Sequence, residues 1–154
     1  MRAAILALLV LLSSPRAVEA EPTGLWWADG GAAQVEIIQC DDALCGQIVW
    51  LRSPLDEHGC PLRDAENPDA ALRERSVIGI QLLAGLRASS EVAGEWSGGE
   101  IYDPGSGRTY RAFLRMDGAD RLRLRGYLGF RVLGRTTVWT RVRAERQCLD
   151  VPRS

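Results

Sequence analysis

The stretch AQVEIIQCDDALCGQIVWL, residues 33–51, contains two segments in which apolar and polar side chains alternate, separated by a polar turn. Val35 and Ile37 fall on one face of the first segment and their polar neighbours on the other, which is the period of a half-buried strand. Two such segments around a short turn predict an antiparallel hairpin, with one strand at 33–40 and the next at 45–51.

The same alternation recurs on both sides of this hairpin, between clusters of Gly, Asp, Asn, Pro and Ser. One strand is predicted before it, at 24–28, with a turn at 29–31. Five more strands are predicted after it, at 77–86, 96–102, 108–116, 121–128 and 134–143. Residues 52–75 are polar and rich in Pro, Asp and Glu, so we expect a long loop there with one helical turn at 69–74.

Eight antiparallel strands in up-and-down order can close on themselves, which removes exposed edges and leaves an interior for side chains or one small ligand. The predicted fold is therefore all-β, a single antiparallel up-and-down β-barrel of about eight strands. An open or two-layer β-sandwich is the structural alternative. The sequence contains no visible internal repeat or second domain.

The first twenty residues have the layout of a secretory signal peptide: Met1 and Arg2, an apolar run over 3–12, and small residues up to Ala20. The apolar run is half of the roughly twenty residues that a permanent membrane-spanning helix needs. We therefore expect cleavage after Ala20, export to the periplasm, and a single barrel domain over 21–154.

The four cysteines, at positions 40, 45, 60 and 148, are an even number in a protein expected to enter an oxidising compartment, which favours disulfides. Three pairings are open. Cys40 and Cys45 flank the turn of the hairpin, so a bridge between them is geometrically natural and leaves Cys60 to pair with Cys148. The spacing is not that of a zinc finger or ribbon, and His58 is the only histidine, so we expect no metal.

All 19 basic residues are arginines, and they are unevenly distributed. Residues 21–99 hold 13 acidic residues and 5 arginines, whereas residues 100–154 hold 6 acidic residues and 12 arginines. The simpler interpretation is that these stretches face each other or solvent; the alternative is a basic surface for an anionic partner such as a phospholipid headgroup. Arg121, Arg123 and Arg125 share one strand face, and we expect that face to be the outer one.

Aromatic residues occur on most of the predicted strands and are more often core than ligand contacts. If the barrel has a cavity, its inward aromatics would favour an apolar or planar ligand. The candidate ligand-binding residues are Trp50, Trp96, Tyr102, Tyr110 and Tyr127.

The long loop gathers His58 and several carboxylates, which we interpret as a solvated acidic segment. Those carboxylates are Asp56, Glu57, Asp64, Glu66 and Asp69. The sequence has neither an EF-hand spacing nor a nucleophile elbow, so we expect no catalytic residues and no cofactor.

Gly24-Leu25-Trp26 on the first predicted strand and Trp139-Thr140-Arg141 on the last resemble the features that close a lipocalin-type barrel. In such barrels an indole fills the closed end and a guanidinium stacks on it. We therefore interpret Gly24, Trp26, Trp139 and Arg141 as structural.

The sequence as a whole resembles a bacterial family of exported proteins named for domain of unknown function 2147. The matching stretches are Gly24–Trp26, Cys40 with Leu44–Trp50, Asn67–Asp69 with Leu72-Arg73, Val77–Ile80, Gly99–Tyr110, Leu122–Tyr127 and Trp139–Arg141. The resemblance implies a calycin-like barrel and an envelope location, and it carries no catalytic residues. Cys60 and Cys148 are outside the shared pattern.

The leading functional hypothesis is a periplasmic, non-enzymatic binding protein whose barrel takes a small apolar or amphipathic ligand of the lipid or fatty-acid class. The alternative is an envelope protein-interaction or structural module, with a packed barrel that acts through its Arg-rich surface. An enzyme acting through His58, or through Tyr102 and Asp103, ranks third. We expect no nucleic-acid partner.

Overall fold

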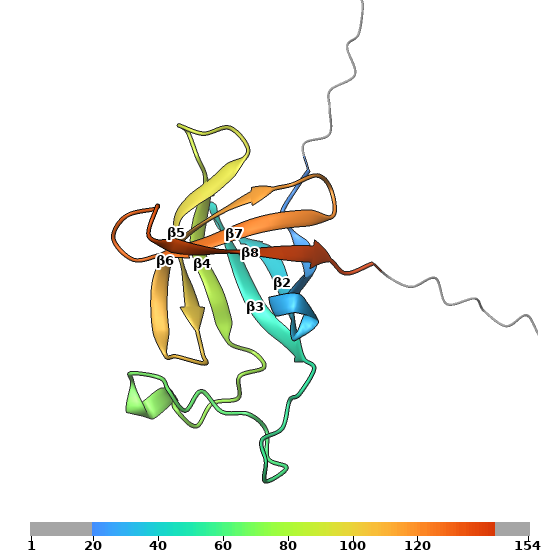
Figure 1. Cartoon of the computed structure of the whole chain (residues 1–154), viewed down its shortest axis with the longest axis vertical. Coiled ribbons are helices and arrows are strands. Elements are labelled where there is room, and N and C mark those ends of the chain that lie inside the picture. The colour runs from blue at the N-terminus through green and yellow to red at the C-terminus, as the bar shows by residue number, and fades with distance from the viewer. Residues whose placement is uncertain (1–19, 144–154) are drawn as a thin grey trace, which may run out of the picture.

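The structure is a computed structural model that describes residues 20–143. Eight strands follow one another and close into an antiparallel barrel, with β8 paired back to β1 (Figure 1). The strands are β1 (Gly24–Ala28), β2 (Ala33–Cys40), β3 (Ala43–Leu51), β4 (Gln81–Ala88), β5 (Glu95–Asp103), β6 (Arg108–Met116), β7 (Arg121–Tyr127) and β8 (Gly134–Arg141). The predicted up-and-down barrel is confirmed, and the sandwich alternative is wrong.

The signal peptide is predicted for residues 1–20. Residues 1–19 lie outside the described residues, and Ala20 is the first described residue. Within residues 20–143 no helix has the length and apolarity needed to cross a bilayer.

One strand differs clearly from its predicted bounds. The apolar run from Val77 to Ile80 is predicted as the start of a strand, but β4 begins only at Gln81. The run is apolar because Ile80 is buried in the core, whereas its backbone takes a turn in which Ile80 N–H donates to Val77 O at 3.2 Å. Gly79 within this turn has a φ of 100°, which only glycine adopts freely.

The helical turn predicted at 69–74 is present as a short 3-10 helix, Ala70–Leu72. It begins where the Asp69 side chain accepts a hydrogen bond from Ala71 N–H at 2.9 Å.

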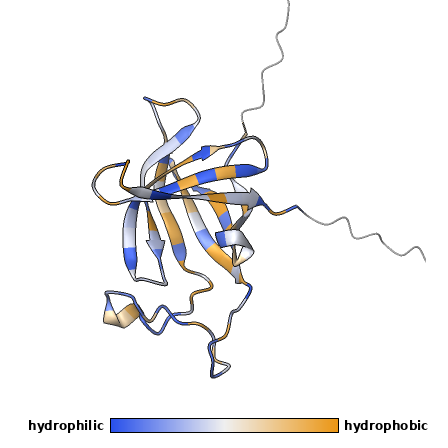
Figure 2. Cartoon of the chain, in the orientation of Figure 1, coloured by the Kyte–Doolittle hydropathy of each residue, from blue (hydrophilic) through white to orange (hydrophobic). Residues whose placement is uncertain are grey.

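The hydrophobic core lies inside the barrel, and the strands alternate hydrophobic and hydrophilic residues along their length (Figure 2). In β2, Val35 and Ile37 are buried while Ile38 is exposed, as the alternation predicts. Because the strands run up and down in order, the β1–β2, β3–β4, β5–β6 and β7–β8 loops lie at one end of the barrel. β1 begins and β8 ends at the opposite end.

That opposite end is closed by Trp26 and Arg141. Trp26 is fully buried, and the Arg141 guanidinium lies over its ring, 4.2 Å from the centroid. Arg141 also donates to the carbonyls of Thr23, Glu21 and Ala119 at 2.7–2.9 Å, so one side chain joins the N-terminal segment to the β6–β7 turn.

Gly24 is required at the closed end for two reasons. Its φ of 118° is unfavourable for a residue with a side chain, and a Cβ there would lie 2.8 Å from Arg141 Nη1. The glycine of the Gly-x-Trp pattern therefore leaves space for the Arg141 guanidinium. Trp139 is buried on the inward face of β8.

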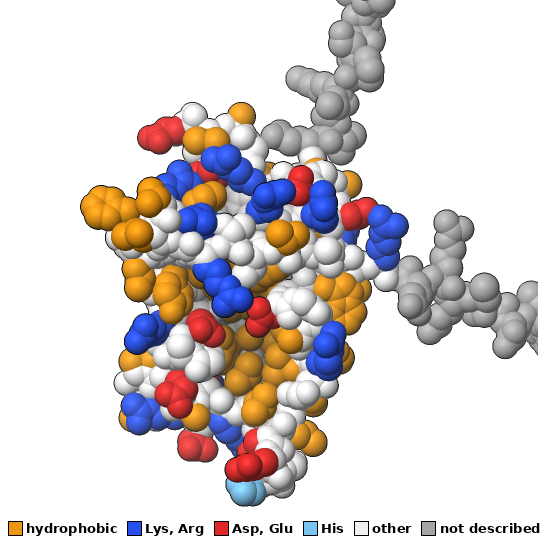
Figure 3. Space-filling view, in the orientation of Figure 1, with side chains coloured by type: hydrophobic (Ala, Val, Ile, Leu, Met, Phe, Trp, Pro, Cys, Tyr) orange, Lys and Arg blue, Asp and Glu red, His pale blue; other side chains and the backbone are white. Residues whose placement is uncertain are grey.

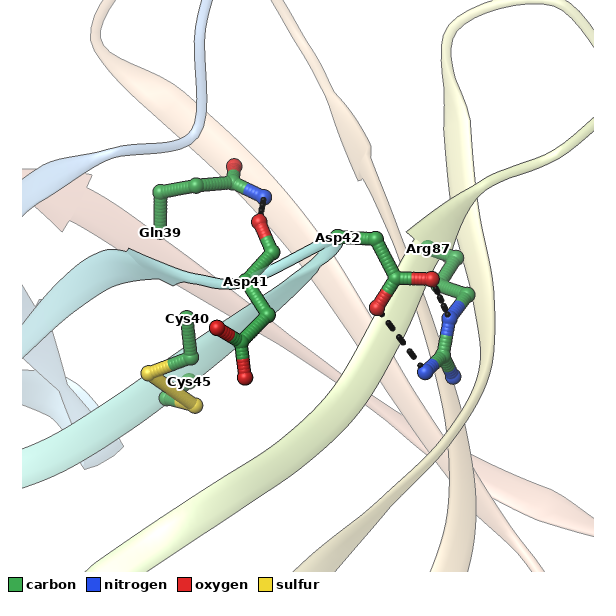
Figure 4. Close-up of a disulfide and its surroundings, with 6 residues drawn as sticks. All are labelled: Gln39, Cys40, Asp41, Asp42, Cys45 and Arg87. Carbon is green, nitrogen blue, oxygen red and sulfur yellow. Dashed lines mark hydrogen bonds and ion pairs between the residues drawn. A yellow bond between two sulfur atoms is a disulfide. The ribbon is translucent and has the colours of Figure 1, made fainter.

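The predicted disulfide between Cys40 and Cys45 is confirmed, with a Cα–Cα distance of 5.8 Å (Figure 4). Beside it, Arg87 on β4 donates to both carboxylate oxygens of Asp42 at 2.8 and 3.0 Å, which ties the hairpin turn to a third strand. Cys60 is exposed, and its predicted partner, Cys148, lies outside the described residues.

Candidate functional site: a cavity at the open end of the barrel

The barrel is hollow at the end opposite Trp26. A cavity of about 520 Å³ opens there, and Figure 3 shows a hollow with a hydrophobic floor on the face toward the viewer. This volume is within the range of small-molecule binding sites, roughly 300–1,000 Å³. The barrel is therefore not packed throughout, because it has a buried core and a ligand-sized cavity at its open end.

The cavity is lined by the inward faces of the strands and by three of the connecting loops. Its apolar walls include Val35, Ile48, Leu82, Ile101, Leu124 and Trp139. Polar groups on its lining are Asp29, Tyr102, Asp103, Tyr110, Arg135 and Thr137. The site therefore combines an apolar interior with a small number of polar groups, as ligand pockets commonly do.

Asp103 and Arg135, two of the charged residues on the lining, differ in whether they already have hydrogen-bond or ion-pair partners within the protein. Asp103 accepts hydrogen bonds from Gly105 N–H at 3.0 Å and from the Ser106 hydroxyl at 2.6 Å, which hold the β5–β6 turn. Arg135 alternates with Thr137 and Trp139 on the inward face of β8. Among the described residues, no carboxylate pairs with Arg135 and no hydrogen bond holds its guanidinium.

Two of the five predicted ligand-binding residues, Tyr102 and Tyr110, line this cavity. Tyr127 faces outward, with its ring 6.2 Å from that of Phe113. Trp96 lies at the other end of the barrel, beside a separate cavity of about 80 Å³. Neither Trp96 nor Tyr127 is on the lining of the candidate site, so the structure does not support their prediction as ligand contacts there.

Trp50 is the third predicted contact that lies elsewhere, and a β-bulge explains why. Gln34 pairs with Trp50 and Val35 with Ile48, so Val49 is an extra residue on β3. An extra residue reverses the alternation of a strand. Trp50 therefore points outward, with its ring in an edge contact with Trp27 at 5.4 Å, and Leu51 takes the inward place on the cavity lining.

The β3–β4 loop is fixed beside the cavity by a buried polar cluster around Asp64. The fully buried Asp64 carboxylate accepts hydrogen bonds from the Tyr102 hydroxyl at 2.6 Å, from Asn67 Nδ2 at 2.7 Å and from Arg75 Nε at 2.9 Å. Burial alone would raise the pKa of Asp64, but these hydrogen bonds outweigh burial and hold the pKa below its usual value.

The interpretation of Asp64 as part of a solvated acidic segment is therefore wrong. No local pattern marks this residue, because Tyr102 is 38 positions further along the chain. The loop is also seated closely on the β5–β6 turn, since a Cβ at Gly107 would overlap the carbonyl oxygen of Glu66. Tyr102 thus has two roles, as cavity lining and as an anchor for the loop.

The other predicted charged groups of the loop, His58, Asp56, Glu57, Glu66 and Asp69, are not on the cavity lining. His58 is exposed, 3.5 Å from the Glu57 carboxylate, and Asp56 accepts hydrogen bonds from the backbone N–H groups of His58 and Cys60. Within residues 20–143 no group of His, Cys, Asp or Glu side chains has the arrangement of a metal site.

Comparisons with known proteins agree with this geometry. The sequence profile of a bacterial family, described as an uncharacterised protein conserved in bacteria (DUF2147), matches residues 24–141, which include all eight strands. The structure is similar to that of HP1028 from Helicobacter pylori, described as a protein of the lipocalin family, with a TM-score of 0.69 and 20% sequence identity. The similarity covers 80% of this chain and 84% of the other. No curated protein matches the sequence.

Proposed function

The chain belongs to the DUF2147 family of bacterial proteins, and from its lipocalin-like barrel we propose that it is an exported, non-enzymatic carrier of an amphipathic ligand of the lipid or fatty-acid class. The observation that carries the proposal is the apolar cavity of about 520 Å³, open at one end of the barrel. Export to the periplasm rests on the signal-peptide layout of the first twenty residues.

The apolar walls and polar groups of the cavity suit an amphiphile, and Arg135 is the basic residue on a lining that also carries Asp29 and Asp103. The apolar walls suit a hydrocarbon tail, because burying apolar surface is favourable in proportion to its area. Arg135 is an exposed residue on the cavity lining with no carboxylate partner among the described residues, and a guanidinium can donate two hydrogen bonds to one carboxylate or phosphate. The head would therefore lie near Arg135 and the tail would point toward Trp139.

A variant that fills the cavity tests this proposal. Thr137→Trp adds a large side chain on the inward face of β8, and we expect it to weaken the binding of a fluorescent long-chain fatty acid by at least tenfold. Titration of delipidated, refolded protein measures the affinity. Val138→Trp is the matched control, because Val138 is the next residue on the same strand and its side chain is exposed on the outside.

The control should bind as tightly as the unmodified protein. If the unmodified protein shows no saturable binding with any chain length tested, or if both tryptophan variants bind equally well, the carrier proposal is wrong.

A second variant tests the position of the head. Arg135→Gln removes the charge, and a charge-assisted hydrogen bond contributes roughly 1.5–3 kcal/mol, so we expect a carboxylate ligand to bind about tenfold or more weakly. An alcohol of the same chain length should be affected little. Isothermal titration of both ligands gives the comparison, and equal losses for acid and alcohol would contradict a specific contact between Arg135 and the head.

A further inference from the structure

The β7–β8 loop, residues 128–133, exposes an unusual amount of apolar surface. Leu128, Phe130, Val132 and Leu133 have exposed fractions between 55% and 78%, and they are the four most exposed large hydrophobic residues in the described part of the chain. The loop lies at the left of the barrel in Figure 1, and hydrophobic side chains gather at that edge in Figure 3. Contiguous apolar surface of this kind usually marks an interaction site.

The loop is held in one conformation by hydrogen bonds to its backbone. Arg125 Nε donates to Arg131 O at 2.7 Å and Arg125 Nη2 donates to Val132 O at 2.8 Å. Leu133 N–H donates to Phe130 O at 2.9 Å. Three carbonyls of the loop are therefore paired inside the protein, which lowers the cost of taking them out of water.

The middle of the loop is anchored to the barrel wall through Arg131. Arg131 donates to the buried carboxylate of Glu95 at 2.6 Å, and its guanidinium lies 3.8 Å from the centroid of the Phe113 ring. Glu95 also accepts two hydrogen bonds from Arg115, at 2.9 and 2.7 Å. Because Arg131 is fixed in this way, the apolar side chains on either side of it stay exposed instead of folding onto the barrel.

The charge around the loop is positive. Residues 124–137, which are the loop and the strand ends beside it, contain three arginines, Arg125, Arg131 and Arg135, and no acidic residue. Among the described residues, Arg125 and Arg135 have no carboxylate partner, so their charges are not neutralised at the loop. An exposed apolar tip with nearby guanidinium groups matches the two layers of an anionic bilayer surface, acyl chains below and negative headgroups above.

We propose that the β7–β8 loop is a membrane-docking element that inserts its apolar side chains into the surface of an anionic lipid bilayer. A bilayer fits these features better than a protein groove, because the tip projects, three of its carbonyls are paired internally, and the charged residues of the loop and the adjoining strand ends are all arginines. The loop also begins next to the cavity: Gly126 and Arg135 pair across β7 and β8, and both line it. Docking would then bring the cavity close to lipid, a consequence that rests on the proposed carrier function.

Vesicle co-sedimentation of the chain beginning at Glu21 tests the inference. We expect binding to vesicles of phosphatidylcholine with phosphatidylglycerol, and at least tenfold weaker binding to phosphatidylcholine alone. Binding should also fall in about 1 M salt, where the Debye length is about 3 Å. Phe130→Ser combined with Leu133→Ser should weaken binding to the anionic vesicles by tenfold or more, because two large apolar groups no longer insert.

The matched control is Ile38→Ser combined with Leu55→Ser, which removes two exposed apolar side chains (49% and 52% exposed) from outside the loop. It should bind anionic vesicles like the unmodified protein. Val132→Glu, a single change at the most exposed of the four residues, should abolish binding because it adds a negative charge to the tip.

The inference would be overturned by no binding of the unmodified protein to anionic vesicles, or by equal losses in the tip and control variants. Self-association that the tip variant abolishes, without vesicle binding, would assign the loop to a protein contact and would also overturn it. The tip residues are not on the cavity lining, so fatty-acid titration of the tip variant in solution should be unchanged. Failure of docking and failure of the carrier function can therefore be told apart.

Discussion

Replacing Trp26 by alanine is expected to lower the free energy of unfolding by about 3–5 kcal/mol, the usual cost of removing a large buried aromatic side chain. Trp26 is fully buried and closes one end of the barrel. Its Nε1–H donates to Pro22 O at 2.8 Å, and Arg141 stacks on its ring. The substitution therefore removes apolar contacts, leaves Pro22 O without its donor and leaves the guanidinium without its platform. Urea denaturation followed by far-ultraviolet circular dichroism measures the change.

Trp27→Ala is the matched control for this prediction. Trp27 is the next residue on β1, but it faces outward, is only partly buried and meets Trp50 through an edge contact. We expect it to cost less than half as much as Trp26→Ala. Equal losses at the two positions would contradict the assignment of barrel closure to Trp26.

The number and order of the strands could be predicted because most of them have one face in the core and the other in water. Val35 and Ile37 alternate with polar neighbours for this reason, and turn residues separate the segments. The start of β4 could not be predicted in this way. Ile80 lies in a turn, but its side chain is buried in the core. An apolar residue at a buried position looks the same in sequence whether its backbone is a strand or a turn.

The candidate site could be predicted only in part, because strand alternation separates two faces without telling which one is inward. Tyr102 and Tyr110 are on the cavity lining and Tyr127 is not, although all three lie on predicted strands. At Trp50 the alternation itself is broken by the bulge at Val49, which leaves no sign in the local composition. Arg135 could not be predicted because its inward direction depends on the register of β8 with β7.

Asp64 holds the β3–β4 loop in place at the open end of the barrel, beside the cavity. The long β3–β4 loop joins two strands at the open end, and its buried carboxylate is bonded to a residue that lines the cavity, Tyr102. Asn67 and Arg75, both further along the loop, converge on the same carboxylate. The position of the loop at the mouth of the barrel therefore depends on one charged group and its three donors.

Replacing Asp64 by asparagine is accordingly expected to lower the free energy needed to open the loop by about 3 kcal/mol, the lower end of the range for breaking a buried ion pair, since the Arg75 side chain is 39% exposed. Hydrogen exchange of the backbone N–H groups at positions 64 and 77, which bond to Arg75 O and Leu62 O in the native loop, should become on the order of a hundredfold faster. Glu66→Gln is the matched control, because Glu66 is exposed two residues away.

The pH dependence of this difference gives a test of its electrostatic origin. The pKa of Asp64 is lowered in the folded protein, so its contribution is fully present above the unfolded pKa of about 3.9 and is lost as the pH falls through the folded pKa. The free energy needed to open the loop should therefore exceed that of the Asp64→Asn variant by a constant amount from pH 7 to about pH 5, and this difference should shrink below pH 4. If this difference in free energy persisted unchanged into that acid range, the packing of the loop, and not the charge of Asp64, would hold the loop against the barrel.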